Sequence, residues 1–134
     1  MELKEYIKER FGNDNGFIAN HDFKVVSLTA EEAVLSYEIK DSGLNPQNTV
    51  HGGLLFGLAD TCAGMLGCMT GRFPVTTTAS MNYLRPAVEG TITALAKALK
   101  VGKTLGYYSV EIFDEKNNLI ATSQVNMFFK EDKK

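Results

Sequence analysis

The chain has 134 residues, of which 44% are apolar and 22% are charged, and its formal net charge is −2. This composition suits one globular domain spanning residues 1–134, and the small net charge gives no electrostatic basis for binding DNA or RNA. The two cysteines lie six residues apart in one apolar segment, too far apart on a helix to bridge, and residues 1–10 lack the apolar core of a signal peptide, so we expect a cytoplasmic protein.

The first third of the chain predicts a short helix followed by a hairpin. Residues 2–11 place apolar side chains at helical spacing between charges, which is typical of an amphipathic helix. Turn-forming residues 12–16 end it. Two strand-like runs follow at residues 23–28 and 33–39, with a hairpin connection between them, and residues 41–50 form a loop.

Residues 52–71 differ from the rest of the chain. Thiols aside, their only side chain that ionises at neutral pH is Asp60. The embedded carboxylate and the many glycines favour a buried core helix over a membrane-inserted one. A helix that is apolar on every side needs cover on every side, and one curved sheet covers only part of it. The remaining chain has little to supply a second layer, so we expect a homo-oligomer.

The second half of the chain predicts strands only. Segments rich in Thr, Val, Ile, Tyr and Phe are separated by turn signals, and they span residues 76–84, 91–101, 104–113 and 119–129. The alternation of apolar and polar side chains in the last of them suits an antiparallel sheet with one buried face. The lysine-rich end, residues 130–134, is expected to be frayed.

The glycines of the predicted central helix recur in register with Asp60. They share one stripe of the helix surface with it: Gly53, Gly57, Gly64, Gly67 and Gly71. Each glycine inside a helix costs about 1 kcal/mol relative to alanine. We therefore expect another backbone or a ligand to approach this stripe closely, with Asp60 projecting into the contact.

The start of this helix offers backbone donors. The preceding segment, Thr49-Val50-His51, puts no Ser, Asp or Asn before the first turn, so we expect no side-chain cap. The amides of Gly52 and Gly53 are then free at the positive end of the helix dipole, which favours a developing oxyanion. On one helix, Gly52 and Asp60 are about 12 Å apart. Gly52 of one subunit is therefore expected to meet Asp60 of another across a two-fold interface.

Asp60 has two interpretations from the residues alone. As a general base or nucleophile facing an oxyanion site, it suits acyl transfer. As a structural carboxylate, it accepts backbone hydrogen bonds or pairs with an arginine, because an unpartnered buried charge is costly.

The segment Asn45 to Gly53, with Asp60 nine places after His51, resembles the hotdog-fold acyl-CoA thioesterases of the phenylacetate-pathway (PaaI-like) type. Residues 81–87 and 101–104 agree with the same family. The resemblance implies an α+β hotdog fold, in which a curved antiparallel sheet of five to six strands wraps a long central helix, here with a short N-terminal helix added. It also implies a dimer with one continuous sheet, commonly assembled into a tetramer as a dimer of dimers.

The resemblance assigns catalytic roles to named residues. Asp60 is implied to be the nucleophile or general base, and the Gly52 amide to polarise the thioester carbonyl. Asn45 and His51 are implied to orient the thioester and its leaving sulfur. Thr76 falls, to within a residue or two, where the family has a hydroxyl that assists the attacking water.

Four more residues are expected at the substrate, namely Gly53, Thr77, Arg85 and Lys103. The last two are candidates for the phosphates of coenzyme A, with plain surface charge as the alternative. The resemblance also has one departure, because Asn48 stands where relatives often carry glycine. We expect this asparagine to affect the loop backbone without removing chemistry.

No metal and no cofactor apart from the coenzyme A of the substrate are expected. The chain has only two histidines, His21 and His51, and no metal-binding spacing. Cys62 lies roughly opposite Asp60 on the helix with no histidine to activate it, and both it and Cys68 are expected to be core thiols.

The predicted function is hydrolysis of an acyl- or aryl-CoA to the free acid and coenzyme A. The main alternative is a non-catalytic acyl-CoA sensor on the same scaffold, which would not need Asp60. A hydratase or dehydratase and a thioesterase for carrier-protein-bound acyl groups are further alternatives.

Overall fold

The computed structural model describes residues 2–13 and 16–131. Its elements are α1 (Leu3–Gly12), α2 (Phe17–His21), β1 (Lys24–Leu28), β2 (Glu32–Glu38), the 3-10 turn η1 (Asp41–Gly43), α3 (Gly52–Cys68), β3 (Phe73–Tyr83), β4 (Thr91–Val101), β5 (Leu105–Phe113) and β6 (Leu119–Lys130). None of the helices in these ranges has both the length and the hydropathy needed to span a bilayer.

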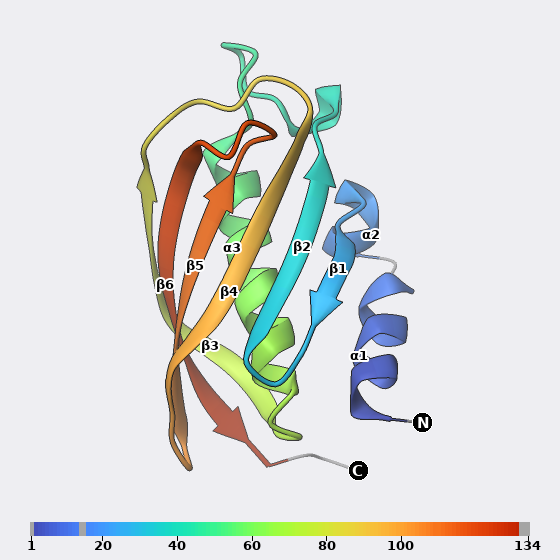
Figure 1. Ribbon diagram of the computed structural model, residues 1–134, viewed down its shortest axis with the longest axis vertical. Coiled ribbons are helices and arrows are strands. Elements are labelled where there is room, and N and C mark those ends of the chain that lie inside the picture. Colours follow the sequence, from blue (N-terminus) through green and yellow to red (C-terminus); the bar gives the residue numbers. More distant parts are fainter. Residues whose placement is uncertain (1, 14–15, 132–134) are drawn as a thin grey trace.

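The strands form one antiparallel sheet in the order β1-β2-β4-β5-β6-β3. This sheet curves around α3, which runs along its inner face (Figure 1). Alternate residues of β2, β4 and β5 are buried, as the period of two requires. The predicted α+β hotdog fold, with a long central helix, a wrapped sheet and a short N-terminal helix, is confirmed.

Small side chains on the central strands let α3 lie close to the sheet. Ala94 and Ala96 of β4 and Ala33 of β2 are completely buried. The Cys62 thiol of α3 donates to the carbonyls of Ala33 at 3.3 Å and Ala94 at 3.6 Å. Interiors are packed to crystal density, so these alanines fix the depth at which α3 sits.

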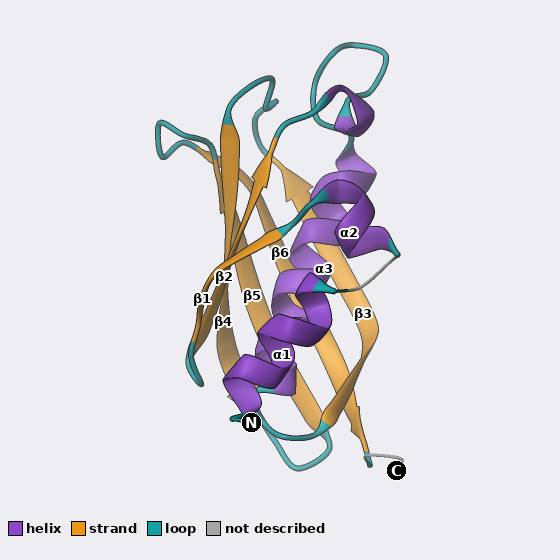
Figure 2. Cartoon of the chain, turned by 90° about the vertical axis from the view of Figure 1, so that its right-hand side faces the viewer, coloured by secondary structure: helices purple, strands orange, loops and turns teal. Residues whose placement is uncertain are grey.

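The N-terminal segment covers one flank of α3. Both α1 and α2 lie beside the helix on the side of edge strand β1 (Figures 1 and 2). The predicted helix at residues 2–11 is confirmed as α1, whose Ile7 is 2% exposed, whereas α2 was not predicted. The expectation that the chain had little to add beyond the sheet was therefore wrong for this flank.

The end of α3 also differs from the prediction. The helix ends at Cys68, and Gly71 lies in the following turn with a φ of 81°, a left-handed conformation that glycine adopts without strain. The chain consequently enters β3 at Phe73, three residues before the predicted start at Thr76. Gly71 is a turn glycine and does not belong to the helical stripe.

Side chains of the same chain fill part of the glycine stripe. A Cβ at Gly57 would lie 2.5 Å from the ring of Phe17, and a Cβ at Gly67 would lie 3.1 Å from both Met127 and Pro74. The expectation that a backbone or a ligand contacts the stripe was wrong at these two glycines. A Cβ at Gly64 would meet Met127 at an ordinary 3.7 Å.

Candidate active site

Asp60 lies in the middle of α3 and is half-buried. The hydroxyl of Thr76 donates a hydrogen bond to Asp60 Oδ1 at 2.6 Å. A short bond of this kind to a carboxylate is charge-assisted and roughly twice as strong as a neutral one. Strand β3, which carries Thr76, runs alongside α3, so the pair joins the helix to this strand.

A β-bulge selects which threonine reaches Asp60. The pairing of β3 with β6 shifts register between Thr76 and Thr78. Thr76 stands opposite Met127, whose side chain is buried, whereas the Thr77 hydroxyl donates to the Asn126 carbonyl at 3.1 Å. The structure thus brings Thr76 to the carboxylate and commits Thr77 to the sheet.

His51 caps α3, contrary to the prediction that no side chain would do so. Its Nδ1 accepts the Gly53 amide at 2.8 Å. Histidine is not among the preferred N-cap residues, which is why the prediction failed. An Nδ1 that accepts must be unprotonated, so the neutral imidazole carries its proton on Nε2. Gly53 is therefore satisfied within the chain, and the exposed His51 ring keeps one donor free for a substrate.

The sequence predicted free backbone amides at both Gly52 and Gly53, and of these two the structure leaves only the Gly52 amide as a free donor among the described residues. As the first residue of α3 its amide has no intrahelical partner, and within the described ranges it has no other acceptor. Tyr83 Oη donates to the Gly52 carbonyl at 2.9 Å, and a Cβ at position 52 would lie 3.2 Å from that ring. Tyr83 was not predicted as a site residue, because the register of β3 places it there and no local pattern marks it.

Asn45 organises the loop before α3. Its Oδ1 accepts the amides of Gln47 at 3.0 Å and Thr49 at 3.2 Å, and its Nδ2 donates to Thr49 Oγ1 at 2.8 Å. Asn48 within this loop has a φ of 61°. Asparagine tolerates this left-handed conformation better than most residues, so Asn48 maintains the backbone that glycine favours.

A cavity of about 290 Å³ opens at the start of α3. We call it the entrance cavity, and its lining is Asn45, Thr49, Val50, Gly52, Leu55, Tyr83, Leu84, Arg85, Pro86 and Ala87. It brings three of the predicted site residues together, namely Asn45, Gly52 and Arg85. A second cavity of about 300 Å³ lies between α1 and the end of α3, beside Cys68 and Arg72.

Lys103 lies away from the entrance cavity. It sits in the turn between β4 and β5, at the opposite end of the molecule from the loop before α3 (Figure 1). Its carbonyl accepts a hydrogen bond from Arg72. Within one chain, Lys103 and Arg85 therefore lie near opposite ends of α3.

Neither cysteine is built as a nucleophile. Burial raises the pKa of the Cys62 thiol to about 12, and burial also raises the pKa of Cys68. A thiol with a raised pKa carries little reactive thiolate at neutral pH. Both are free, Cys62 in the core and Cys68 partly exposed, so the prediction of a core thiol holds fully only for Cys62.

Comparison with known proteins identifies the family of this chain. Residues 47–121 match the thioesterase superfamily. Acyl-coenzyme A thioesterase PaaI of Escherichia coli K12 is 32% identical over 98 residues, 72% of this chain and 70% of that protein. The structure of the E. coli PaaI protein from the phenylacetic acid degradation operon has a TM-score of 0.87 at 26% identity and covers 95% of this chain and 94% of that one.

A third relative was solved with a ligand. The crystal structure of smu.793 from Streptococcus mutans UA159, bound to acetyl CoA, has a TM-score of 0.83 at 25% identity and covers 91% of this chain and 99% of that one. The segment that matches the superfamily is more than half of the chain and contains His51, Gly52 and Asp60. The chain therefore belongs to the thioesterase superfamily and is a PaaI-like thioester hydrolase with the hotdog fold.

Proposed function

We propose that this protein hydrolyses the thioester of an acyl- or aryl-coenzyme A to the free acid and coenzyme A, at sites shared between two subunits. The observation that carries the proposal is the Asp60 carboxylate, which is half-buried in the middle of α3 and hydrogen-bonded by Thr76 of β3. The name of the E. coli relative and the acetyl CoA bound to the S. mutans relative support coenzyme A as the carrier of the acyl group.

The spacing along α3 supports a shared site. Gly52 and Asp60 are eight residues apart on one helix, so they are separated by about 12 Å and cannot act on the same carbon atom. In a two-fold dimer, the Gly52 amide of one subunit can meet the Asp60 carboxylate of the other. This amide would donate to the oxygen of the thioester as it gains negative charge.

The exposed edge of the sheet supports a dimer. Strand β3 has eleven residues and pairs with β6 on one side, and within the described chain its other edge has no partner strand. Most of its side chains are exposed. A long unpaired edge is a template for another strand. Pairing of two β3 strands would extend the sheet through both subunits and bring the two Asp60–Thr76 pairs to the interface, and a dimer of such dimers would form a tetramer.

The reaction proposed here uses protein groups and water, with no cofactor beyond the coenzyme A of the substrate. Asp60 removes a proton from water held beside Thr76, and the resulting hydroxide attacks the thioester carbon. The carbon–sulfur bond then breaks while the His51 Nε2–H hydrogen-bonds the departing sulfur, and the proton that Asp60 took from water passes to the thiolate, which gives the thiol and restores the Asp60 carboxylate. The free thiols Cys62 and Cys68 fit a reducing, cytoplasmic compartment.

A direct attack by Asp60 on the carbonyl, which forms an anhydride, is the alternative first step. Single turnover in water labelled with oxygen-18 separates the two routes. Label in the Asp60 carboxylate identifies the anhydride, whereas label confined to the product acid agrees with attack by water.

The substitution Asp60→Asn tests the proposal, because it keeps the acceptor for Thr76 and removes the base. We expect kcat to fall by roughly 10²-fold or more, measured as thiol release from a panel of acyl-CoAs. The control is Asp41→Asn, which alters an exposed carboxylate before the loop and should keep full activity. Undiminished turnover by folded Asp60→Asn would overturn the assignment.

A further inference from the structure

We propose that Phe17 is the residue that limits the size of the acyl group, by standing on Gly57 as a wall beside the reacting carboxylate. This inference rests on the proposed function, because it assumes that the thioester carbon lies at Asp60. It adds a residue from the unpredicted helix α2 to the substrate site.

The Phe17 ring contacts the backbone of α3. A Cβ at position 57 would lie 2.5 Å from Phe17 Cζ and 2.6 Å from Cε2, so the ring rests directly on helix backbone. Only glycine permits this approach. Phe17 nevertheless stays 47% exposed, so its outer face is available to a ligand.

The Phe17 ring also lies close to Asp60, because it contacts α3 at Gly57. Gly57 and Asp60 are three residues apart, which is about 4.5 Å along the helix axis and about 60° around it. Thr76 binds Asp60 from β3, whereas Phe17 contacts Gly57 from α2. An acyl carbon at Asp60 therefore has the Thr76 hydroxyl and the Phe17 ring as neighbours from two different elements.

A cluster of aromatic side chains supports the Phe17 ring. Phe17 packs on His21 with ring centroids 4.6 Å apart and on Phe23 at 5.7 Å, and Phe23 in turn packs edge-on against Tyr37 at 5.7 Å. Phe23 is 6% exposed and Tyr37 is completely buried. Aromatic contacts of this kind are worth about 0.5–1.5 kcal/mol each beyond burial. The exposed ring thus stands on a rigid base and does not hang from a loose loop.

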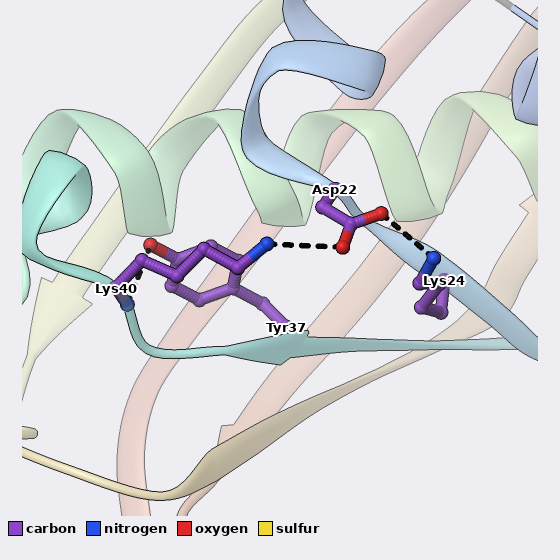
Figure 3. A network of polar contacts seen from close by, with 4 residues as sticks. All are labelled: Asp22, Lys24, Tyr37 and Lys40. Atoms are coloured by element: carbon purple, nitrogen blue, oxygen red, sulfur yellow. Dashed lines mark hydrogen bonds and ion pairs between the residues drawn. The ribbon is translucent and has the colours of Figure 1, made fainter.

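Two ion pairs hold the end of α2 in place. Its C-cap, Asp22, has a left-handed φ of 55°. The Asp22 carboxylate accepts from Lys24 Nζ at 2.7 Å and Lys40 Nζ at 3.0 Å (Figure 3), and these two ammonium groups lower its pKa. The bridge ties the end of α2 to β1 and to the segment after β2. Because the three side chains are 42–66% exposed, the role of this bridge is to set position more than to add stability.

Among the described residues, the helix surface one turn beyond Asp60 has no contact as close as that of Phe17 with Gly57. A Cβ at Gly64, one turn further along α3, would meet Met127 Cε at 3.7 Å, which is an ordinary contact. The steric limit near the carboxylate therefore lies on the Phe17 side. Removing the ring should admit longer and bulkier acyl groups at the expense of compact ones.

The test is a series at position 17 with Trp, Phe, Leu and Ala. For each variant, the readout is the ratio of kcat/KM for decanoyl-CoA to kcat/KM for butyryl-CoA. We expect the ratio to rise as the side chain shrinks, by about tenfold or more from Phe to Ala, which is the scale of discrimination for a hydrophobic pocket. Phe128→Ala, which removes a 40% exposed ring from β6, is the matched control and should leave the ratio unchanged.

The outcomes separate this inference from the proposed function. A flat ratio across the series, or a ratio that falls from Phe to Ala, overturns the role of Phe17 even when Asp60→Asn is inactive. A wild-type protein that releases thiol from neither of these substrates nor from any other acyl- or aryl-CoA tested overturns the proposed function and this inference with it. Phe17→Leu keeps the test decisive if Phe17→Ala does not fold.

Discussion

The start of α3 and its middle hold the two halves of the proposed reaction site, and contacts within one chain fix the first half more completely than the second. At the start, His51 caps the helix, Asn45 closes the loop, and Tyr83 covers Gly52, so each contact joins residues of the same chain. In the middle, Asp60 is positioned by Thr76 and stays half-buried. The proposed oxyanion donor is thus set by contacts within one chain, whereas the proposed reactive geometry uses a second chain.

The largest expected effect tests the donor at the start of α3. Gly52→Pro removes the one first-turn amide that has no acceptor among the described residues, yet proline is tolerated at the first position of a helix. We expect kcat to fall by about 10²–10³-fold, as for loss of one oxyanion donor.

The matched control for this prediction is Gly52→Ala, which keeps the amide. Its Cβ would lie 3.2 Å from the Tyr83 ring, which is 53% exposed and able to shift. We expect a loss of a few fold at most from this variant. Equal activity of the proline and alanine variants would remove the Gly52 amide from the reaction.

A smaller effect is expected at the middle of α3. Thr76→Val keeps the shape of the side chain and deletes its hydrogen bond to Asp60, which is worth about 1.5–3 kcal/mol for a charged acceptor. We expect kcat to fall by about tenfold. In the comparison variant Thr77→Val, only a bond to the Asn126 carbonyl is lost, so activity should persist. If the two variants were equally impaired, the bulge would not discriminate between the threonines.

The smallest effect concerns the loop before α3 and is seen in stability. Asn48 has a left-handed backbone, which costs most non-glycine residues about 1–2 kcal/mol. We expect Asn48→Ala to lower the free energy of unfolding by about 1 kcal/mol, and Asn48→Gly to stay within about 0.5 kcal/mol of the wild type. Urea unfolding at a fixed protein concentration measures both. Indistinguishable alanine and glycine variants would contradict the left-handed loop.

Elements with strong periodicity could be predicted from the sequence. The amphipathic spacing of α1 and the alternation of β4 and β6 depend on neighbours in the chain, and their bounds came within about two residues of the prediction. By contrast, α2 has five residues and is held by tertiary contacts of Phe17, so no local pattern marks it. The early end of α3 was missed because Gly71 was assigned to the helical stripe.

The site residues also divide into those that a local sequence pattern marks and those that long-range contacts place. Asp60 and Gly52 can be found from composition and helix position alone, as a lone carboxylate and the first residue of a helix that no Ser, Asp or Asn precedes. The choice of Thr76 over Thr77 depends on a bulge between β3 and β6, and the contact of Tyr83 with Gly52 depends on where β3 ends. Both are long-range register effects. The His51 cap was missed because a ring nitrogen took the place of the usual side-chain oxygen.

The most direct test of the shared site is complementation between two inactive variants. Asp60→Asn and Gly52→Pro are produced together with different tags, and the mixed dimers are isolated. In a shared site, one of the two sites of each mixed dimer receives Asp60 from one chain and Gly52 from the other, so these dimers should recover about half of the wild-type activity. Mixed dimers as inactive as either parent would contradict a site built from two chains.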